Sequence, residues 1–166
     1  MDLRSASVVL DVGPGIRPQS VIRCAVHILL EPHRPYLDAV AGDYIRWNAT
    51  WEAMALLPDA AVDTVVALDF IEHLTKADGR RFLAEAARVA SSQVVIFTPL
   101  GFMRQDQTGP TDAWGMGGMA WQRHRSGWTP EDFDGYEVEV LAGFCREDEN
   151  GPRAVPVDAL WAVRSL

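Results

Sequence analysis

The chain has 166 residues, of which 48% are hydrophobic and 23% are charged. This length suits one globular domain of roughly 100–200 residues, and the composition excludes a disordered or collagen-like chain. The formal net charge of −8 gives a surface that repels phosphate backbones, so nucleic acid is not an expected partner. The sequence has neither an apolar leader at its N-terminus nor a run near the roughly 20 apolar residues that span a bilayer. We therefore expect a cytoplasmic protein without a membrane partner.

The first third of the chain alternates short apolar runs with polar segments. Strands are predicted at Ser7 to Val12, Ala25 to Leu30 and Tyr44 to Trp47, because these runs are rich in β-branched and aromatic residues. Helices are predicted between them, at Pro18 to Cys24, where proline suits the first turn, and at Arg34 to Ala41.

The middle of the chain contains the clearest helix. Val62 to Leu68 predicts a strand with both faces covered, because it is almost continuously apolar. Thr75 is a suitable N-cap for the helix that follows, and Phe82, Leu83, Ala86 and Val89 recur at helical spacing. The next strand is predicted at Gln93 to Thr98.

The end of the chain is predicted to form a hairpin. A helix start with proline in its first position is expected at Thr129 to Asp132. Two strands follow, at Tyr136 to Gly143 and Asp158 to Arg164, and their short polar link requires antiparallel pairing. Strands that alternate with helices predict an α/β fold, a Rossmann-like doubly wound sheet of seven strands in three layers.

Ligands of a doubly wound sheet bind outside the carboxyl ends of its strands. The first predicted strand ends in Asp11 and the turn Gly13-Pro14-Gly15, where glycine lets the backbone approach a ligand closely. The second ends in Glu31, whose carboxylate can accept hydrogen bonds from ribose hydroxyls. The fourth ends in the run from Asp69 to Leu74, which contains His73. Taken singly, these features also fit a tight turn, a solvated carboxylate and a histidine without a role.

Four segments resemble class I S-adenosylmethionine-dependent methyltransferases, in particular small members of the type 11/12 group. They are V-V-L-D-V-G-P-G-I-R-P-Q at 8–19, D-T-V-V-A-L-D-F-I-E-H-L at 63–74, V-V-I-F-T-P at 94–99 and H-R-S-G-W-T-P-E-D-F at 124–133. The 63–74 segment is the most specific match, and the resemblance covers nearly the whole chain. It implies the strand order 3-2-1-4-5-7-6 with the seventh strand antiparallel. It also implies one S-adenosylmethionine-binding domain over residues 1–166.

The resemblance implies binding sites for the cofactor S-adenosylmethionine and its product S-adenosylhomocysteine. Acidic and glycine residues after the first strand would face the amino-acid end, and Glu31 would hold the ribose. The residues implied in cofactor binding are Asp11, Gly13, Pro14, Gly15, Glu31, Pro32, Asn48, Ala49, Asp69 and Phe70. Three departures from the family pattern are Arg17 in place of a third glycine, Asn48 in place of an adenine-binding acid, and the few residues before the first strand.

A long loop from about residue 100 to residue 128 is expected to act as a lid-like insertion over the acceptor. Loops of this length in compact domains are usually functional or disordered, and this one is rich in large apolar side chains. The substrate-binding candidates in it are Phe102, Met103, Trp114, Trp121, Arg125 and Trp128. The same side chains also suit a dimer contact or the core of a folded loop, so a monomer and a homodimer both remain open.

The chemistry implied is in-line methyl transfer to an oxygen or nitrogen of a small-molecule acceptor. A hydroxyl acceptor must lose a proton, and neutral imidazole is the natural base near neutral pH, so His73 and then His124 are the catalytic candidates. No metal is expected, since no Cys/His spacing or acidic cluster indicates one. Two alternatives are a cofactor-binding or interaction domain with a degenerate acceptor site and, less well supported, a nicotinamide-dependent dehydrogenase, whose dinucleotide pattern does not accommodate Pro18.

Overall fold

The computed structural model describes residues 3–104, 112–148 and 151–166. Its strands are β1 (Val8–Val12), β2 (Val26–Leu30), β3 (Ile45–Trp47), β4 (Val62–Leu68), β5 (Ala90–Pro99), β6 (Glu137–Asp148) and β7 (Gly151–Ser165). Its α-helices are α1 (Arg34–Ala39), α2 (Lys76–Val89) and α3 (Met119–Gln122), and its 3-10 turns are η1 (Trp51–Leu56), η2 (Ile71–His73) and η3 (Pro130–Asp132). Within the described residues, every helix is too short or too polar to cross a membrane.

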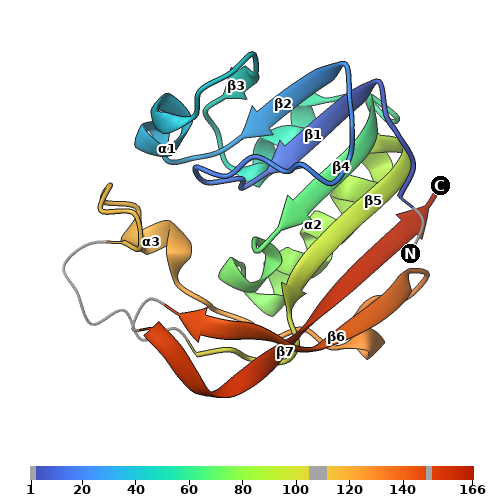
Figure 1. Cartoon of the computed structure of the whole chain (residues 1–166). Helices are drawn as coiled ribbons and strands as arrows, with labels where there is room; N and C mark the ends of the chain where they lie inside the picture. Colours follow the sequence, from blue (N-terminus) through green and yellow to red (C-terminus); the bar gives the residue numbers. More distant parts are fainter. Residues whose placement is uncertain (1–2, 105–111, 149–150) are drawn as a thin grey trace.

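The seven strands form one mixed sheet in the order β3-β2-β1-β4-β5-β7-β6 (Figure 1). The first five strands pair in parallel, while β7 pairs antiparallel to both β5 and β6. This confirms the predicted α/β fold class, the strand order and the antiparallel C-terminal hairpin.

The register of the parallel strands brings their carboxyl ends to one edge. Val12 pairs with Leu30, Leu30 pairs with Trp47, and Asp11 pairs with Val66. The arrowheads of β1, β2 and β4 therefore point to the same side of the molecule, where α1 and α3 lie (Figure 1). The loops that follow these strands are consequently neighbours, although they are far apart in the sequence.

The larger core lies between the sheet and α2, which passes behind β4 and β5 in Figure 1. Thr75 caps α2 by accepting a hydrogen bond from the backbone N–H of Asp78, as its sequence predicts. The apolar stripe of α2 is buried against the sheet, and Trp128 is fully buried in the same core. This core therefore fixes both the helix after β4 and the late segment that contains Trp128.

The opposite face of the sheet is covered by α1 over β2 and by irregular chain over β1 and β4. The predicted helix at Pro18 to Cys24 is wrong, because the Gln19 side chain satisfies the local backbone in another way. The Gln19 amide accepts from Ile22 N at 2.8 Å and donates to Ile22 O at 3.0 Å, while Gln19 N donates to Asp11. These bonds replace the i to i−4 pattern of a helix.

The predicted helix at Thr129 to Asp132 is also shorter than expected, because it forms only the single turn η3. Thr129 and Asp132 close a capping box, and Lys76 Nζ lies 2.5 Å from Asp132 Oδ2. Phe133 then turns into the core and packs on Trp128 with ring centroids 5.6 Å apart. The packing of Phe133 directs the chain into β6 instead of a longer helix.

Replacing Gly79 in α2 with alanine is expected to destabilise the fold, although glycine to alanine in a helix usually stabilises by about 0.5–1 kcal/mol. A Cβ at this position would lie 2.3 Å from Trp128 Cζ2 and 3.3 Å from Ile71 Cγ1. Overpacking of this kind costs roughly 1–3 kcal/mol. Urea unfolding measures the change, and G79A combined with W128F should recover part of the loss because the shorter ring vacates the space. A more stable G79A protein would contradict this packing.

Candidate cofactor and acceptor site

A cavity of about 380 Å³ opens at the carboxyl ends of β1, β2 and β4, within the range of ~300–1,000 Å³ typical of small-ligand sites. Twelve of the residues singled out in the sequence line it: Gly13, Gly15, Glu31, Pro32, Asp69, Phe70, His73, Met103, Trp114, Trp121, His124 and Arg125. The sequence did not single out several other lining residues, which include Tyr36, Thr50, Trp51, Glu52, Glu72 and Gln122. The cavity thus joins the candidate cofactor loop to the candidate catalytic histidines.

The glycine turn after β1 can accommodate only glycine. Gly13 and Gly15 have φ angles of +68° and +56°, a region that side chains disfavour. A Cβ on Gly13 would lie 2.2 Å from the Phe70 ring, and one on Gly15 would lie 2.3 Å from the Trp114 ring. Two aromatic rings therefore contact the backbone of this loop directly.

Glu31 closes β2 beside the same loop and is only 3% exposed. One carboxylate oxygen accepts from Gly15 N at 3.1 Å, and the other accepts from His33 N at 2.9 Å. Burial raises the pKa of this carboxyl above its ordinary value, against the opposing effect of the two N–H donors. Glu31 therefore presents a hydrogen-bond acceptor to the cavity, and its hydrogen bond to the glycine turn fixes its position.

Four of the residues expected to bind cofactor lie outside the cavity lining: Asp11, Pro14, Asn48 and Ala49. Asp11 is buried and accepts from Gln19 N at 2.8 Å, and its Oδ2 lies 3.1 Å from His27 Nε2. The Asn48 amide donates to the carbonyls of Glu31 at 2.8 Å and Pro32 at 2.9 Å. Both side chains hold the strand ends in place beneath the cavity.

Two carboxyl groups lie close together after β4. Asp69 is an exposed residue with φ +50°, an unusual conformation for a residue other than glycine, whereas Glu72 is only 2% exposed. Burial raises the pKa of Glu72 above the ordinary range, and partial desolvation together with repulsion by Glu72 raises that of Asp69. Thr98 Oγ1 donates to Glu72 Oε2 at 2.9 Å, while the positive charge of Arg17 acts on Asp69 in the opposite direction to burial.

His73 is a neutral imidazole beside these carboxyl groups. Burial lowers its pKa to about 4, although nearby backbone carbonyls favour the protonated ring. Its Nδ1 atom is buried and has no hydrogen-bond partner among the described residues. The ring meets that of His124 edge to face, with centroids 4.9 Å apart.

His124 reaches this position because the segment after α3 is anchored to η2. The carbonyl of Glu72 accepts from Arg125 N at 2.8 Å and from Ser126 N at 3.1 Å. Trp128 Nε1 donates to the Ile71 carbonyl at 3.3 Å, which places Trp128 in the core and outside the cavity. Phe102 also lies outside the cavity lining and is 60% exposed.

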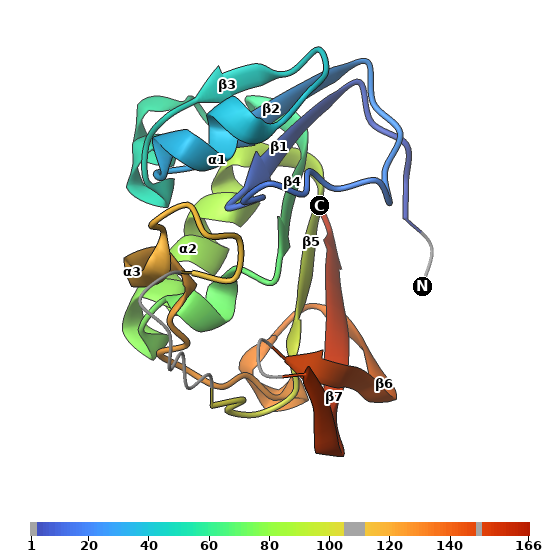
Figure 2. The same ribbon diagram turned by 60° about the vertical axis from the view of Figure 1, so that its left-hand side comes forward.

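The segment 112–122 lies over the glycine loop and is organised by one buried carboxylate. Asp112 accepts from the backbone N–H groups of Trp114, Met116 and Gly118, and from Tyr36 Oη at 2.9 Å. Tyr36 and Trp114 pack edge to face at 4.7 Å. Figure 2 shows α3 close to α1 and α2, at the side where the strand ends lie. The sequence signal for this loop is an aspartate that precedes a glycine-rich run, and its role follows only from the structure.

Comparison with known proteins finds similarity in the structure only. No protein-family model matches the sequence, and no curated protein matches it. Solved structures that resemble the chain over almost its whole length are S-adenosylmethionine-dependent methyltransferases. They include one from Archaeoglobus fulgidus, with a TM-score of 0.60, 16% identity, and coverage of 96% of this chain and 86% of that protein.

Two further structures show the same likeness. One is a methyltransferase from Leishmania major, with a TM-score of 0.65, 18% identity, and coverage of 96% of this chain and 65% of that protein. The other is magnesium protoporphyrin IX methyltransferase from Synechocystis with bound S-adenosylmethionine, with a TM-score of 0.56, 14% identity, and coverage of 97% and 71%. The chain therefore has the class I methyltransferase fold, as its sequence motifs imply.

Replacing Glu72 with glutamine is expected to change how stability depends on pH. As the pH rises, the free energy of unfolding of E72Q should increase relative to that of the unaltered protein, with both kept free of metal ions. A raised folded-state pKa contributes stability below the ordinary pKa, and this contribution is lost as pH rises from 4.5 toward about 7. Glutamine removes this loss. Because a pKa difference of one is about 1.4 kcal/mol, the advantage of E72Q should grow by more than ~1 kcal/mol across that window.

The measurement is the free energy of unfolding in urea, at the two ends of this pH window, with EDTA present. E52Q is the matched control, because Glu52 also lines the cavity but is exposed. A difference between E72Q and the unaltered protein that stays constant with pH would contradict a raised pKa at Glu72.

Proposed function

We propose that this chain is an S-adenosylmethionine-dependent methyltransferase that acts on a small-molecule acceptor. The observation that carries the proposal is the Glu31 carboxylate, which is held against the glycine turn in the wall of the cavity. A carboxylate in this place can bind two adjacent ribose hydroxyls, and the bare backbone at Gly13 and Gly15 leaves room for a ligand once Trp114 moves. The class I fold supports the same assignment.

The residues present fit an adenosyl cofactor along the cavity. Glu31 would bind the ribose, and Pro32 and Trp51 would flank the adenine. Gly13, Gly15 and Asp69 would face the amino-acid end, with Asp11 and Asn48 supporting the strand ends from below. When bound, the cofactor supplies an electrophilic methyl group: its carbon–sulfur bond breaks, with the electron pair retained by sulfur, as the bond to the acceptor atom forms.

The acceptor end of the cavity is assigned to the side that His73 and His124 line. For a hydroxyl acceptor, His73 takes the proton on Nδ1, which is buried in the cavity wall without a hydrogen-bond partner among the described residues. His124 supports the acceptor end, with its Nδ1 held 2.6 Å from the Met103 carbonyl. An acceptor that is a neutral amine or a carboxylate needs no such base.

The apolar side chains of Met103, Trp114 and Trp121 favour an acceptor with an apolar or aromatic body, and Arg125 suits an anionic group on it. In this proposal the described part of the 100–128 insertion forms the lid. The bulk charge of −8 disfavours nucleic acid as the acceptor. A small apolar acceptor also agrees with the magnesium protoporphyrin IX methyltransferase among the similar structures.

Thermal unfolding with S-adenosylmethionine, S-adenosylhomocysteine and NAD, each added separately, tests the cofactor. A ligand at 100 times its dissociation constant stabilises the fold by about 2.7 kcal/mol, which raises the melting temperature of a domain of this size by roughly 5–10 °C. We expect the shift with both adenosyl compounds and none with NAD. A shift with NAD alone would favour a dehydrogenase, and the absence of any shift would favour a degenerate domain.

Replacing Glu31 with glutamine is expected to weaken binding of S-adenosylhomocysteine about tenfold or more. The charge-assisted hydrogen bonds to the ribose are worth roughly 1.5–3 kcal/mol, while the amide oxygen can still accept from the glycine turn. Isothermal titration calorimetry measures the dissociation constant, with E52Q as the control from the same cavity. Equal affinity in E31Q and the unaltered protein would remove Glu31 from the cofactor site.

Replacing His73 with alanine is expected to reduce methylation of hydroxyl acceptors by roughly 10²–10⁴-fold and to leave the affinity for S-adenosylhomocysteine nearly unchanged. A panel of phenols, sugar hydroxyls, carboxylates and amines, followed by formation of S-adenosylhomocysteine, measures the effect. E52Q is the control from the same cavity, because Glu52 lines it but is exposed. Full activity of H73A on a hydroxyl acceptor would exclude a role for His73.

A further inference from the structure

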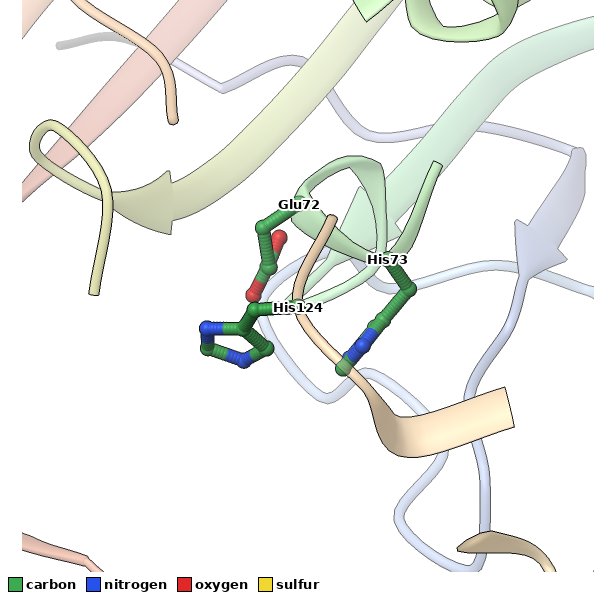
Figure 3. A group of neighbouring side chains, drawn as sticks. All are labelled: Glu72, His73 and His124. Carbon is green, nitrogen blue, oxygen red and sulfur yellow. The ribbon is translucent and has the colours of Figure 1, made fainter. Parts of the chain in front are cut away.

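We propose that Glu72, His73 and His124 form a binding site for one divalent transition-metal ion at the acceptor end of the cavity. One ligand atom from each of these side chains lies within 4.8 Å of the others. Figure 3 shows the three side chains lying together, two from η2 and one from the segment after α3. Two imidazoles and one carboxylate are a donor set that suits ions such as Zn²⁺, Fe²⁺ and Co²⁺. No metal was expected from the sequence, because His124 is far from Glu72 and His73 along the chain and approaches them only after folding.

The spacing is close to that of a bound ion. Metal–nitrogen and metal–oxygen bonds of about 2.0–2.2 Å in a tetrahedral site place two ligand atoms about 3.4 Å apart. The side chains must therefore close from at most 4.8 Å by up to about 1.4 Å, which side-chain rotations can supply. The backbone already holds Glu72 and the His124 segment together through the bonds from Arg125 N and Ser126 N.

His124 has the outer contact that metal-binding histidines usually have. Its Nδ1 lies 2.6 Å from the Met103 carbonyl, which can only accept a hydrogen bond. The proton of the neutral ring is therefore on Nδ1, and Nε2 carries the lone pair. Donation of one ring N–H to a backbone carbonyl fixes the orientation and tautomer of a metal ligand.

Glu72 is oriented in a similar way from the sheet. Thr98 Oγ1, at the end of β5, donates to Glu72 Oε2 at 2.9 Å. The carboxyl is almost completely buried, and a buried carboxylate is costly unless it is paired or coordinates a metal. A bound cation would provide the charge that Thr98, a neutral donor, does not.

An unpartnered ring nitrogen of His73 is a second observation that supports a metal site, independent of the spacing of the three side chains. Its Nδ1 is buried in the cavity wall without a hydrogen-bond partner among the described residues. Buried polar atoms in proteins nearly always have a partner, so an orphaned one calls for an explanation such as an ion.

The proposed ion would change the chemistry of the acceptor end, and this step rests on the proposed function. Three protein ligands leave coordination positions open for an oxygen of the acceptor, as in catalytic metal sites. A coordinated hydroxyl loses its proton to water more readily, because the cation lowers its pKa. In this state His73 is a ligand rather than the base, and its lone pair is held by the ion. The acceptor is then an oxygen compound, such as a phenol or a hydroxy acid.

Cobalt titration of tag-free, EDTA-treated and dialysed protein tests the site directly, since Co²⁺ bound by imidazole and carboxylate absorbs in the visible range. We expect one ion per chain, with competition by Zn²⁺ measured by calorimetry. E72Q and H124A should weaken binding at least 100-fold. T98V leaves all three ligands in place and should weaken binding by about 10–100-fold, the usual effect of losing an outer contact. H33A and E52Q, a histidine and a carboxylate outside the trio, should bind as the unaltered protein does.

Three results would overturn the site: no cobalt absorption, binding that survives in H124A, or equal loss in H33A. Circular dichroism of each variant shows whether it is folded. If E72Q does not fold, T98V tests the site in its place. Titration of the same samples with S-adenosylhomocysteine separates the two proposals. Cofactor binding without cobalt binding contradicts only the metal site, and cobalt binding without cofactor binding contradicts only the proposed function.

Discussion

The hydrogen bonds from Arg125 N and Ser126 N to the Glu72 carbonyl join the turn after β4 to a segment that lies 53 and 54 residues later in the chain. They occur where Trp128 enters the core and donates to the neighbouring carbonyl of Ile71. The packing of Trp128 against Gly79 of α2 prevents this segment from moving away from the sheet. His124 is therefore held against His73 by backbone bonds and core packing, and the acceptor end of the cavity is built before any ligand arrives.

Each strand that reaches the cavity ends in or near a buried carboxyl group, and the way each is stabilised differs. Asp11 and Glu31 accept backbone N–H groups from the turn that follows β1, so their burial shapes that turn. Glu72 accepts a neutral hydroxyl and lies close to Asp69, which makes ionisation of this pair unfavourable. Asp11 thus supports the fold outside the cavity lining, whereas Glu31, Asp69 and Glu72 line the cavity and are placed to respond to a ligand.

The strands were predictable because hydrophobic period and β-branched content are local properties, and the glycine turn and Glu31 were found at the predicted strand ends. The order of the strands in the sheet was implied by the resemblance to class I methyltransferases and not by any local pattern. The structure confirms the fold but differs from expectation at several positions, because these depend on contacts between residues that are distant in the sequence. Gln19 satisfies the backbone where a helix was expected, Asn48 bonds to strand ends, and Trp128 belongs to the core. The Asp112 contact with Tyr36 joins residues 76 positions apart, so no local pattern could reveal it. The approach of His124 to Glu72 and His73 is hidden for the same reason.

The segments that cover the two ends of the cavity are held by different kinds of contact. One is held by side-chain hydrogen bonds and the other by backbone hydrogen bonds, and this difference affects how a ligand enters. The glycine loop is covered by Trp114, which is held through side-chain bonds of Asp112 to Tyr36 and of His33 to the Met116 carbonyl at 2.8 Å. The acceptor end is closed by backbone bonds to Glu72 and by the buried Trp128. Movement of Trp114 breaks side-chain contacts with α1, whereas release of residues 124–128 would expose Trp128, which is fully buried in the larger core. In the proposed function, the cofactor therefore enters by displacement of Trp114, and the histidine pair keeps its geometry throughout.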